Sequence, residues 1–168
     1  MKYFVKKDSK VYCVSLDASK AFDKVLHHGL LVKLFNKGVP VVLIRLLCNW
    51  YSRMSCSVLW NNALGDVFSG VRQNGVLSPI LFSVYVDDLI SLLRDSGYGM
   101  YIDKRFAGCI LYADDILLLS SSCHGLQSML HICNEFGKRW DIHFNPAKTQ
   151  CVTFGGQAIR MHFQECLL

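Results

Sequence analysis

Two adjacent aspartates, Asp114 and Asp115, are the residues of this sequence whose position most directly suggests chemistry. They separate two apolar runs, residues 109–113 and 116–119. Apolar runs of this kind are typical of strands buried on both faces, and a two-residue break between them predicts a tight hairpin. Carboxylates at such a tip repel each other, and a hard divalent cation such as Mg²⁺, which prefers oxygen ligands, would relieve the repulsion. A solvated Asp-Asp turn is the competing interpretation.

A third carboxylate, Asp17, directly follows a predicted buried strand at residues 11–16. Sites in proteins that mix helices and strands often place their chemistry at the end of a core strand. If this strand and the acidic hairpin are central neighbours in one sheet, Asp17 lies beside Asp114 and Asp115. Three carboxylates from separate strands at one sheet edge fit a site for two divalent ions about 3.5–4 Å apart.

The elements that must position these acids follow one another as strand, helical insert, helix, two strands, helix and strand. Ser78 is the predicted N-cap of the third helix, with Pro79 as its first residue. The apolar spacing and turn signals predict helices at 26–36, 40–50, 79–94 and 124–138, a hairpin of 55–60 and 63–69 around Asn61-Asn62, and a last strand at 150–154. The order resembles a ferredoxin-like split β-α-β arrangement, so the predicted fold class is α+β with a helical and hairpin insert.

Composition narrows the possible classes of protein. The 168 residues suffice for one domain, 52% are hydrophobic, and no apolar run reaches the length of a membrane span. The first residues lack a signal-peptide core, so we expect an intracellular protein, nuclear or cytoplasmic, that is not secreted. Eight cysteines without a C-x-x-C pair argue against zinc and for reduced thiols, and a net charge of +5 permits a polyanionic partner.

Four stretches of the sequence resemble the palm motifs of reverse transcriptases from non-LTR (LINE-type) retrotransposons, in the order and with the spacing of that family. They are SLDASKAFD at 15–23, GVRQNGVLSP at 70–79 with the helix that follows, LYADD at 111–115 and NPAKT at 145–149. The resemblance covers about residues 10–156. It implies a palm domain of a right-hand polymerase over residues 1–156, with partial fingers and no thumb, and an unassigned tail over 157–168.

The resemblance also implies which residues act. Asp17 and Asp114 would hold two Mg²⁺ ions, or Mn²⁺ in their place, with Asp115 alongside and the backbone carbonyl of Ala18 as a further ligand. Lys148 would protonate or neutralise the leaving pyrophosphate, against the alternative of an ordinary surface lysine. The implied reaction transfers a nucleotide from a dNTP to the 3′-hydroxyl of a DNA primer on an RNA template.

Three further residues of the second and first motifs would contact the nucleotide. Phe22 matches the family's steric gate, where an aromatic ring crowds a ribose 2′-hydroxyl, although core packing would also explain it. Gln73 would touch the nucleotide sugar, and Arg72 would reach a phosphate or the template backbone unless it is an ordinary solvated arginine. Asn74 stands where the family usually has glycine, and its side chain adds bulk beside the nucleotide.

A second candidate for the acidic motif, Tyr85-Val86-Asp87-Asp88, falls in the middle of the helix predicted for 79–94. Consecutive residues of a helix point about 100° apart, so adjacent carboxylates there do not share a tip. We therefore expect Asp87 and Asp88 to be helix-surface or helix-contact acids.

Other segments of a larger polyprotein would supply the fingers and the thumb, and an endonuclease is a further candidate segment. The sequence leaves open a catalytic palm acting in retrotransposition and an inactive remnant or nucleic-acid-binding module derived from a retrotransposon. A generic RNA-recognition domain ranks below both. Such a domain needs exposed aromatic residues on its central strands, where this sequence has Val14 and the aliphatic and thiol residues 109–111.

Overall fold

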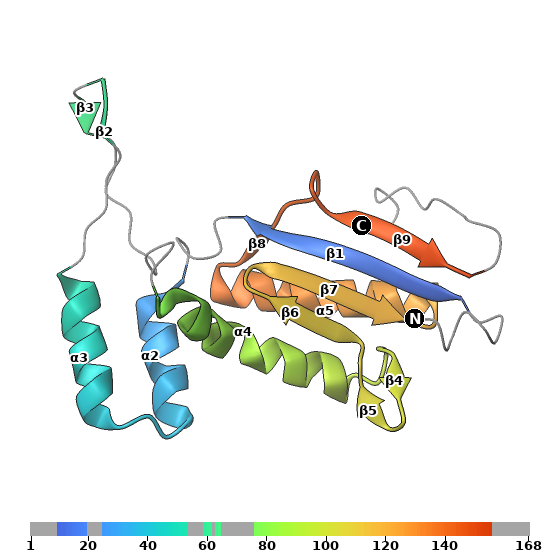
Figure 1. The fold of residues 1–168 in the computed structure, drawn as a ribbon, viewed down its shortest axis with the longest axis horizontal. Coiled ribbons are helices and arrows are strands. Elements are labelled where there is room, and N and C mark those ends of the chain that lie inside the picture. Colours follow the sequence, from blue (N-terminus) through green and yellow to red (C-terminus); the bar gives the residue numbers. More distant parts are fainter. Residues whose placement is uncertain (1–9, 20–24, 54–58, 62, 65–75, 156–168) are drawn as a thin grey trace.

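The computed structural model describes residues 10–19, 25–53, 59–61, 63–64 and 76–155. These residues form a mixed α+β fold around a five-stranded antiparallel sheet (Figure 1). The strands β6 (Cys109–Tyr112), β7 (Asp115–Ser120) and β1 (Val11–Ser19) lie side by side, and β9 (Gln150–Phe154) and β8 (His143–Phe144) share the other edge of β1. The first strand is therefore the neighbour of the acidic hairpin, as the sequence predicted.

Two long helices, α4 (Ser78–Asp95) and α5 (Cys123–Trp140), cover one face of this sheet (Figure 1). Along β1, Val14, Leu16 and Ala18 are buried in the core cluster that includes residues of both helices. Because side chains alternate between the faces of a strand, Ser15 and Asp17 belong to the opposite face, which neither helix covers. This opposite face carries a smaller second cluster of buried residues, Val11, Cys13, Met100 and Leu119, toward one end of the β1–β7 pair, and Asp17 and Asp115 at the other end.

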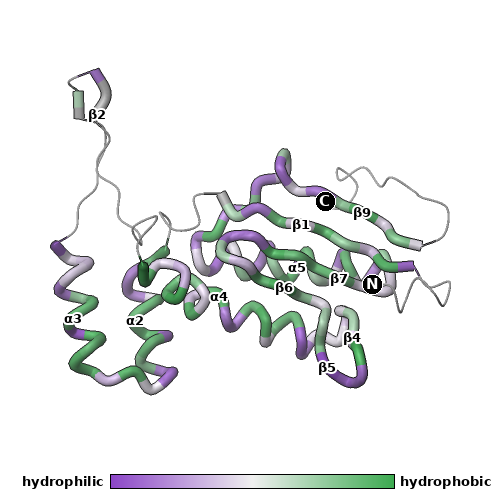
Figure 2. The backbone as a smooth tube through the Cα atoms, in the orientation of Figure 1, coloured by the Kyte–Doolittle hydropathy of each residue, from purple (hydrophilic) through white to green (hydrophobic). Residues whose placement is uncertain are grey.

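The insert between β1 and α4 contains a pair of helices, α2 (His27–Asn36) and α3 (Val41–Ser52), joined through Gly38 at φ 77°. Helix α2 contacts both α4 and α3. Helix α3 is rich in apolar residues (Figure 2), and most of its side chains are exposed. A short hairpin, β2 (Leu59–Trp60) and β3 (Ala63–Leu64), follows the helices. The predicted hairpin around Asn61 is confirmed for these residues, and Asn61 has a positive φ of 49°.

The acidic hairpin differs from the prediction in two ways. Its turn consists of Ala113 and Asp114, since Asp115 is already the first residue of β7 and pairs with Tyr112. The strand β6 is also not buried on both faces, because it is an edge strand whose outer face carries Ile110 and Tyr112, 52% and 81% exposed. An apolar run does not by itself distinguish an edge strand from a central one.

Two smaller details also depart from the sequence predictions. The N-cap of α4 is Leu77, and Ser78 lies inside the helix without capping it. A hairpin of β4 (Tyr101–Ile102) and β5 (Arg105–Phe106) was not predicted, because its turn residues Asp103 and Lys104 take positive φ without the glycine or asparagine that usually marks such a turn.

Among the described residues, no helix is long and apolar enough to cross a membrane.

Candidate active site

The register between β1 and β7 brings two of the predicted carboxylates together. Asp17 lies directly opposite Asp115, and the preceding pair, Leu16 and Ile116, is buried in the core. Residues directly opposite on antiparallel strands project from the same face, with Cβ atoms about 4.5–5.5 Å apart. Both aspartates therefore belong to the face of the sheet opposite α4 and α5, although 97 intervening residues of chain separate them.

Asp114 lies one residue beyond this pair, at the tip of the β6–β7 hairpin. Ala113, the other residue of the turn, has a left-handed backbone with φ 53°. This conformation costs an alanine roughly 1–2 kcal/mol, and strained backbone of this kind is found preferentially at functional sites. The turn projects Asp114 past the end of the sheet, next to Asp115.

Lys148 supplies a positive charge at the same place. Its ammonium lies 3.5 Å and 3.4 Å from the two carboxylate oxygens of Asp17. The turn that carries it is held by Asn145, whose backbone N–H donates to the carbonyl of Asp17 at 2.9 Å. The backbone carbonyl of Asn145 accepts hydrogen bonds from the backbone N–H and the hydroxyl of Thr149. The side-chain oxygen of Asn145 accepts one from the N–H of Ala147.

Lys148 was predicted from the sequence as a site residue, whereas no separate role was predicted for Asn145 or Thr149. The sequence does indicate a turn at Asn145, because an asparagine followed by proline favours a turn in which the asparagine side chain bonds to the backbone. What the sequence could not show is that Asn145 is bonded to the backbone of Asp17, which requires β1 and the segment after β8 to be neighbours in space.

The donor chemistry at this edge fits a hard divalent cation. Asp17 and Asp115 are like charges at opposite positions, and carboxylate oxygens are the ligands that Mg²⁺ prefers. Within the described residues, however, no three side chains of His, Cys, Asp or Glu lie close enough together to hold a metal. The backbone register thus brings Asp17 and Asp115 to neighbouring positions, while the Asp17 carboxylate makes its ion pair with Lys148.

The remaining predicted site residues fall into two groups. Ala18 is described and lies next to Asp17, buried and paired with Phe144 of β8. Phe22, Arg72, Gln73 and the neighbouring Asn74 lie outside the described residues.

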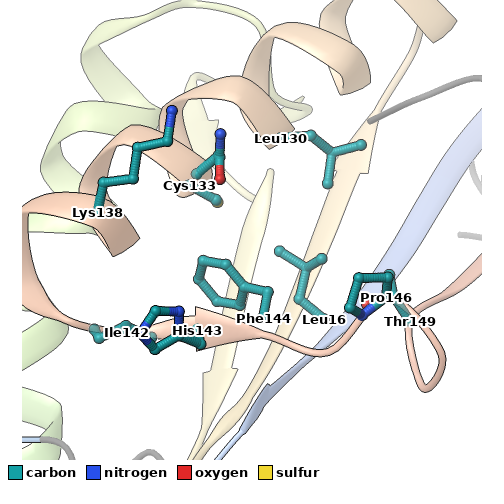
Figure 3. Close-up of a pocket in the computed structure, with 10 residues that line it drawn as sticks. Leu16, Leu130, Cys133, Lys138, Ile142, His143, Phe144, Pro146 and Thr149 are labelled. Carbon is teal, nitrogen blue, oxygen red and sulfur yellow. The ribbon is translucent and has the colours of Figure 1, made fainter. Parts of the chain in front are cut away.

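A cavity of about 190 Å³ lies on the helix side of the sheet, behind the turn that carries Lys148 (Figure 3). It opens between α5 and β8, and its lining is largely apolar. The lining residues are Leu16, Leu130, Cys133, Asn134, Lys138, Ile142, His143, Phe144, Pro146 and Thr149. Because Leu16 and Asp17 project from opposite faces of β1, this cavity does not contain the carboxylates.

The second acidic motif is part of α4, as predicted, and its acids contact another helix. Asp88 pairs with Lys33 of α2 at 2.8 Å, and Asp87 pairs with Lys37 at 2.5 Å. Burial lowers the pKa of Lys33, and the hydrogen bond and charge of Asp88 oppose that shift. These acids therefore attach α2 to α4 and take no part in the site at the sheet edge.

Comparison with known proteins identifies the family of this site. Residues 1–163 match the family model described as reverse transcriptase (RNA-dependent DNA polymerase). The chain is 37% identical over 153 residues to the probable RNA-directed DNA polymerase from transposon BS of Drosophila melanogaster, and 30% identical over 156 residues to that from transposon X-element. These alignments cover 84% and 88% of the chain but only 16% of each relative.

Solved structures show the same fold in more distant proteins. An apo telomerase from Candida tropicalis, truncated from its C-terminal domain, superimposes with a TM-score of 0.65 at 18% identity, covering 95% of this chain and 34% of that one. Since the family model matches nearly the whole chain and transposon polymerases align with most of it, the chain belongs to the reverse transcriptase family and is related to the enzymes of non-LTR retrotransposons.

Proposed function

We propose that this chain is the palm of an RNA-directed DNA polymerase that acts in retrotransposition. The sheet with its two covering helices, of β-α-β-β-α-β order, is the ferredoxin-like palm over residues 1–156, and residues 157–168 stay unassigned. The reaction transfers a nucleotide from a dNTP to the 3′-hydroxyl of a DNA primer on an RNA template. The observation that carries the proposal is the register that sets Asp17 opposite Asp115, with Asp114 at the adjoining tip.

In this proposal, Asp17, Asp114 and Asp115 would hold two Mg²⁺ ions, for which Mn²⁺ can substitute, together with the Ala18 carbonyl. This requires the three carboxylates to move closer together than they lie in the structure. When bound, such ions align the primer hydroxyl with the α-phosphate and neutralise the leaving pyrophosphate. Neither α4 nor α5 lies over the face of the sheet that carries Asp17 and Asp115, so these two helices do not block the approach of a primer end to the carboxylates (Figure 1).

Lys148 acts on the leaving group. Its ammonium is already beside Asp17, on a turn bonded to the backbone of that residue. From there it supplies a proton or a positive charge to the pyrophosphate as the bond to the α-phosphate breaks. Phe22 excludes ribonucleotides, Gln73 contacts the sugar, and Arg72 contacts a phosphate or the template backbone.

Primer extension tests the proposal. Because the chain spans 16% of the length of its transposon relatives, the assay uses an extended polymerase, which we define as this chain joined at both ends to the corresponding segments of the X-element relative. Asp17→Asn and Asp114→Asn should each lower dNTP incorporation on an RNA template by at least about 10²–10³-fold, the usual cost of one group that stabilises a transition state.

Asp103→Asn is the matched control, because Asp103 is also an acid in a hairpin turn but lies in the remote β4–β5 hairpin. Its activity should equal that of the unmodified protein. Equal activity of all three variants would contradict the proposed site. If the extended polymerase is inactive but Asn74→Gly restores incorporation, Asn74 is the inactivating change. If the extended polymerase and its Asn74→Gly variant are both folded and inactive, the chain is an inactive remnant or a nucleic-acid-binding module.

A further inference from the structure

One buried hydroxyl, that of Tyr85 in α4, joins the end of α5 to the start of α2. It donates a hydrogen bond to the carbonyl of Trp140 at 2.7 Å and accepts one from the N–H of Leu26 at 3.3 Å. The last carbonyls of a helix and its first N–H groups have no partner inside the helix. Tyr85 supplies such partners to the last residue of α5 and to the N-cap of α2 at the same time.

The side chain of Tyr85 is held firmly in this position. The side chain is fully buried, and its ring meets that of Trp140 edge to face with the ring centroids 5.4 Å apart. The backbone carbonyl of Tyr85 accepts a hydrogen bond from Lys33 Nζ at 2.5 Å. Trp140 in turn rests against α2, since a Cβ on Gly29 would lie only 2.6 Å from its ring. Burial raises the pKa of Tyr85, so the hydroxyl keeps its proton as a donor.

From Trp140 the chain leads directly to the site through a series of backbone constraints. Asp141 takes a left-handed conformation at φ 52°, and Ile142 N–H donates to the Gly137 carbonyl at 2.9 Å. The two residues of β8 then pair with the end of β1. Asn145 N–H bonds to the Asp17 carbonyl, and the turn that carries Lys148 begins there.

We propose that Tyr85 is a positioning residue of the polymerase, whose hydroxyl sets the direction in which the chain leaves α5 and thereby holds Lys148 beside Asp17. The inference rests on the proposed function, in which Lys148 acts on pyrophosphate. Tyr85 acts through the Trp140 carbonyl and touches no substrate. Since Tyr85 is the first residue of the second acidic motif, Tyr85-Val86-Asp87-Asp88, this motif contributes a positioning residue and not a catalytic one.

A double-mutant cycle in the extended polymerase tests this role. Tyr85→Phe keeps the ring and removes only the hydroxyl, and it should lower incorporation by about 2- to 12-fold, the equivalent of one neutral hydrogen bond. In a Lys148→Ala background the same substitution should cause no further loss, because its effect passes through Lys148. A purely structural role of the hydroxyl would lower incorporation by the same factor in both backgrounds.

Tyr101→Phe is the matched control. The Tyr101 hydroxyl also donates to a carbonyl in the last turn of a helix, Arg94 of α4 at 2.8 Å, but it belongs to the β4–β5 hairpin at the opposite end of the sheet from β8 (Figure 1). Its removal should leave incorporation unchanged. An unchanged rate in Tyr85→Phe, or an equal loss with and without Lys148, would overturn the proposal.

Hydrogen exchange on the 168-residue chain gives a second readout that does not depend on activity. The N–H groups of Asn145 and Thr149 should exchange faster in Tyr85→Phe than in the unmodified chain, and at unchanged rates in Tyr101→Phe. If the extended polymerase and its Asn74→Gly variant both prove inactive, the proposed function fails by that result, and the exchange rates still decide the positioning role. Unaltered protection of the turn in Tyr85→Phe would overturn it.

Discussion

The proposed site contains two like charges at directly opposite strand positions, and this arrangement lowers the stability of the fold. Asp17 and Asp115 carry the same charge on directly opposite residues, an arrangement that destabilises an antiparallel pair by up to about 1 kcal/mol. The ammonium of Lys148, 3.4 Å from a carboxylate oxygen of Asp17, offsets part of this repulsion. The ion pair is partly exposed, so it contributes little to stability.

This repulsion leads to a prediction about metal binding. In the absence of divalent ions, Asp115→Asn should raise the melting temperature by at most a few degrees, because it removes the repulsion with Asp17. Addition of Mg²⁺ or Mn²⁺ should raise the melting temperature of the unmodified chain by mass action and raise that of the variant less. Thermal denaturation with EDTA and with each ion measures both effects.

Asp103→Asn is again the control, and it should respond to metal as the unmodified chain does. If Asp115→Asn and the unmodified chain gain equally from metal, no ion binds at this pair of residues.

At the scale of elements, α4 is the helix that connects the others. It covers the sheet beside α5, and its Asp87 and Asp88 pair with two lysines one turn apart on α2. The ammonium of Lys33 also lies 3.9 Å over the ring of Trp140, so a buried cation links three helices. The acids of the motif Tyr85–Asp88 therefore hold α2 against α4.

The two lysines of α2 should respond to pH in opposite ways. The pKa of Lys33 is lowered by burial, so between that value and its ordinary 10.5 the unfolded chain binds more protons than the folded one. The stability of the unmodified chain relative to Lys33→Met should therefore rise with pH as pH 10.5 is approached. Urea denaturation between pH 8 and 11 measures this difference.

Lys37 is the matched comparison, because the hydrogen bond to Asp87 raises its pKa above 10.5. Its contribution is fully present below pH 10.5 and is lost as the pH rises through the raised pKa, so the advantage over Lys37→Met should fall there. A difference from Lys33→Met that stays constant or falls with pH would contradict a lowered pKa for Lys33.

At the scale of the whole molecule, the chain is a small part of the proteins to which it is similar. It spans 16% of the length of the transposon polymerases described above, and its net charge is only +5. Affinity for a nucleic-acid duplex comes mainly from basic residues that displace counterions from phosphates. A net charge of +5 therefore predicts that few counterions are displaced and that a duplex is bound weakly.

We accordingly expect the 168-residue chain to bind an RNA–DNA primer–template weakly, with a shallow dependence on salt, and to polymerise little. The extended polymerase should bind more tightly, with a steeper salt dependence, and should incorporate dNTPs in the presence of Mg²⁺. Fluorescence anisotropy of a labelled duplex between 50 and 200 mM salt, beside primer extension, measures both. Tight, strongly salt-dependent binding by the 168-residue chain would show that it carries the duplex-binding surface itself.

The sequence by itself determined the order and type of the main elements, because these depend on local interactions. Helices α2, α4 and α5 and strands β1 and β9 lie where apolar spacing and turn residues predicted them. The carboxylates and Lys148 were also identified from the sequence, through motifs that occur in the family order. Local signals gave less at the acidic hairpin, whose turn was predicted one residue too late.

Only the tertiary structure decided which of these residues meet. The register that sets Asp17 opposite Asp115, the contact between Lys148 and Asp17, and the bond from Tyr85 to Trp140 all join segments far apart in the chain. The exposure of β6 likewise depends on its place at the sheet edge. Such pairings follow from how helices and strands pack around one core, and no short stretch of sequence contains that information.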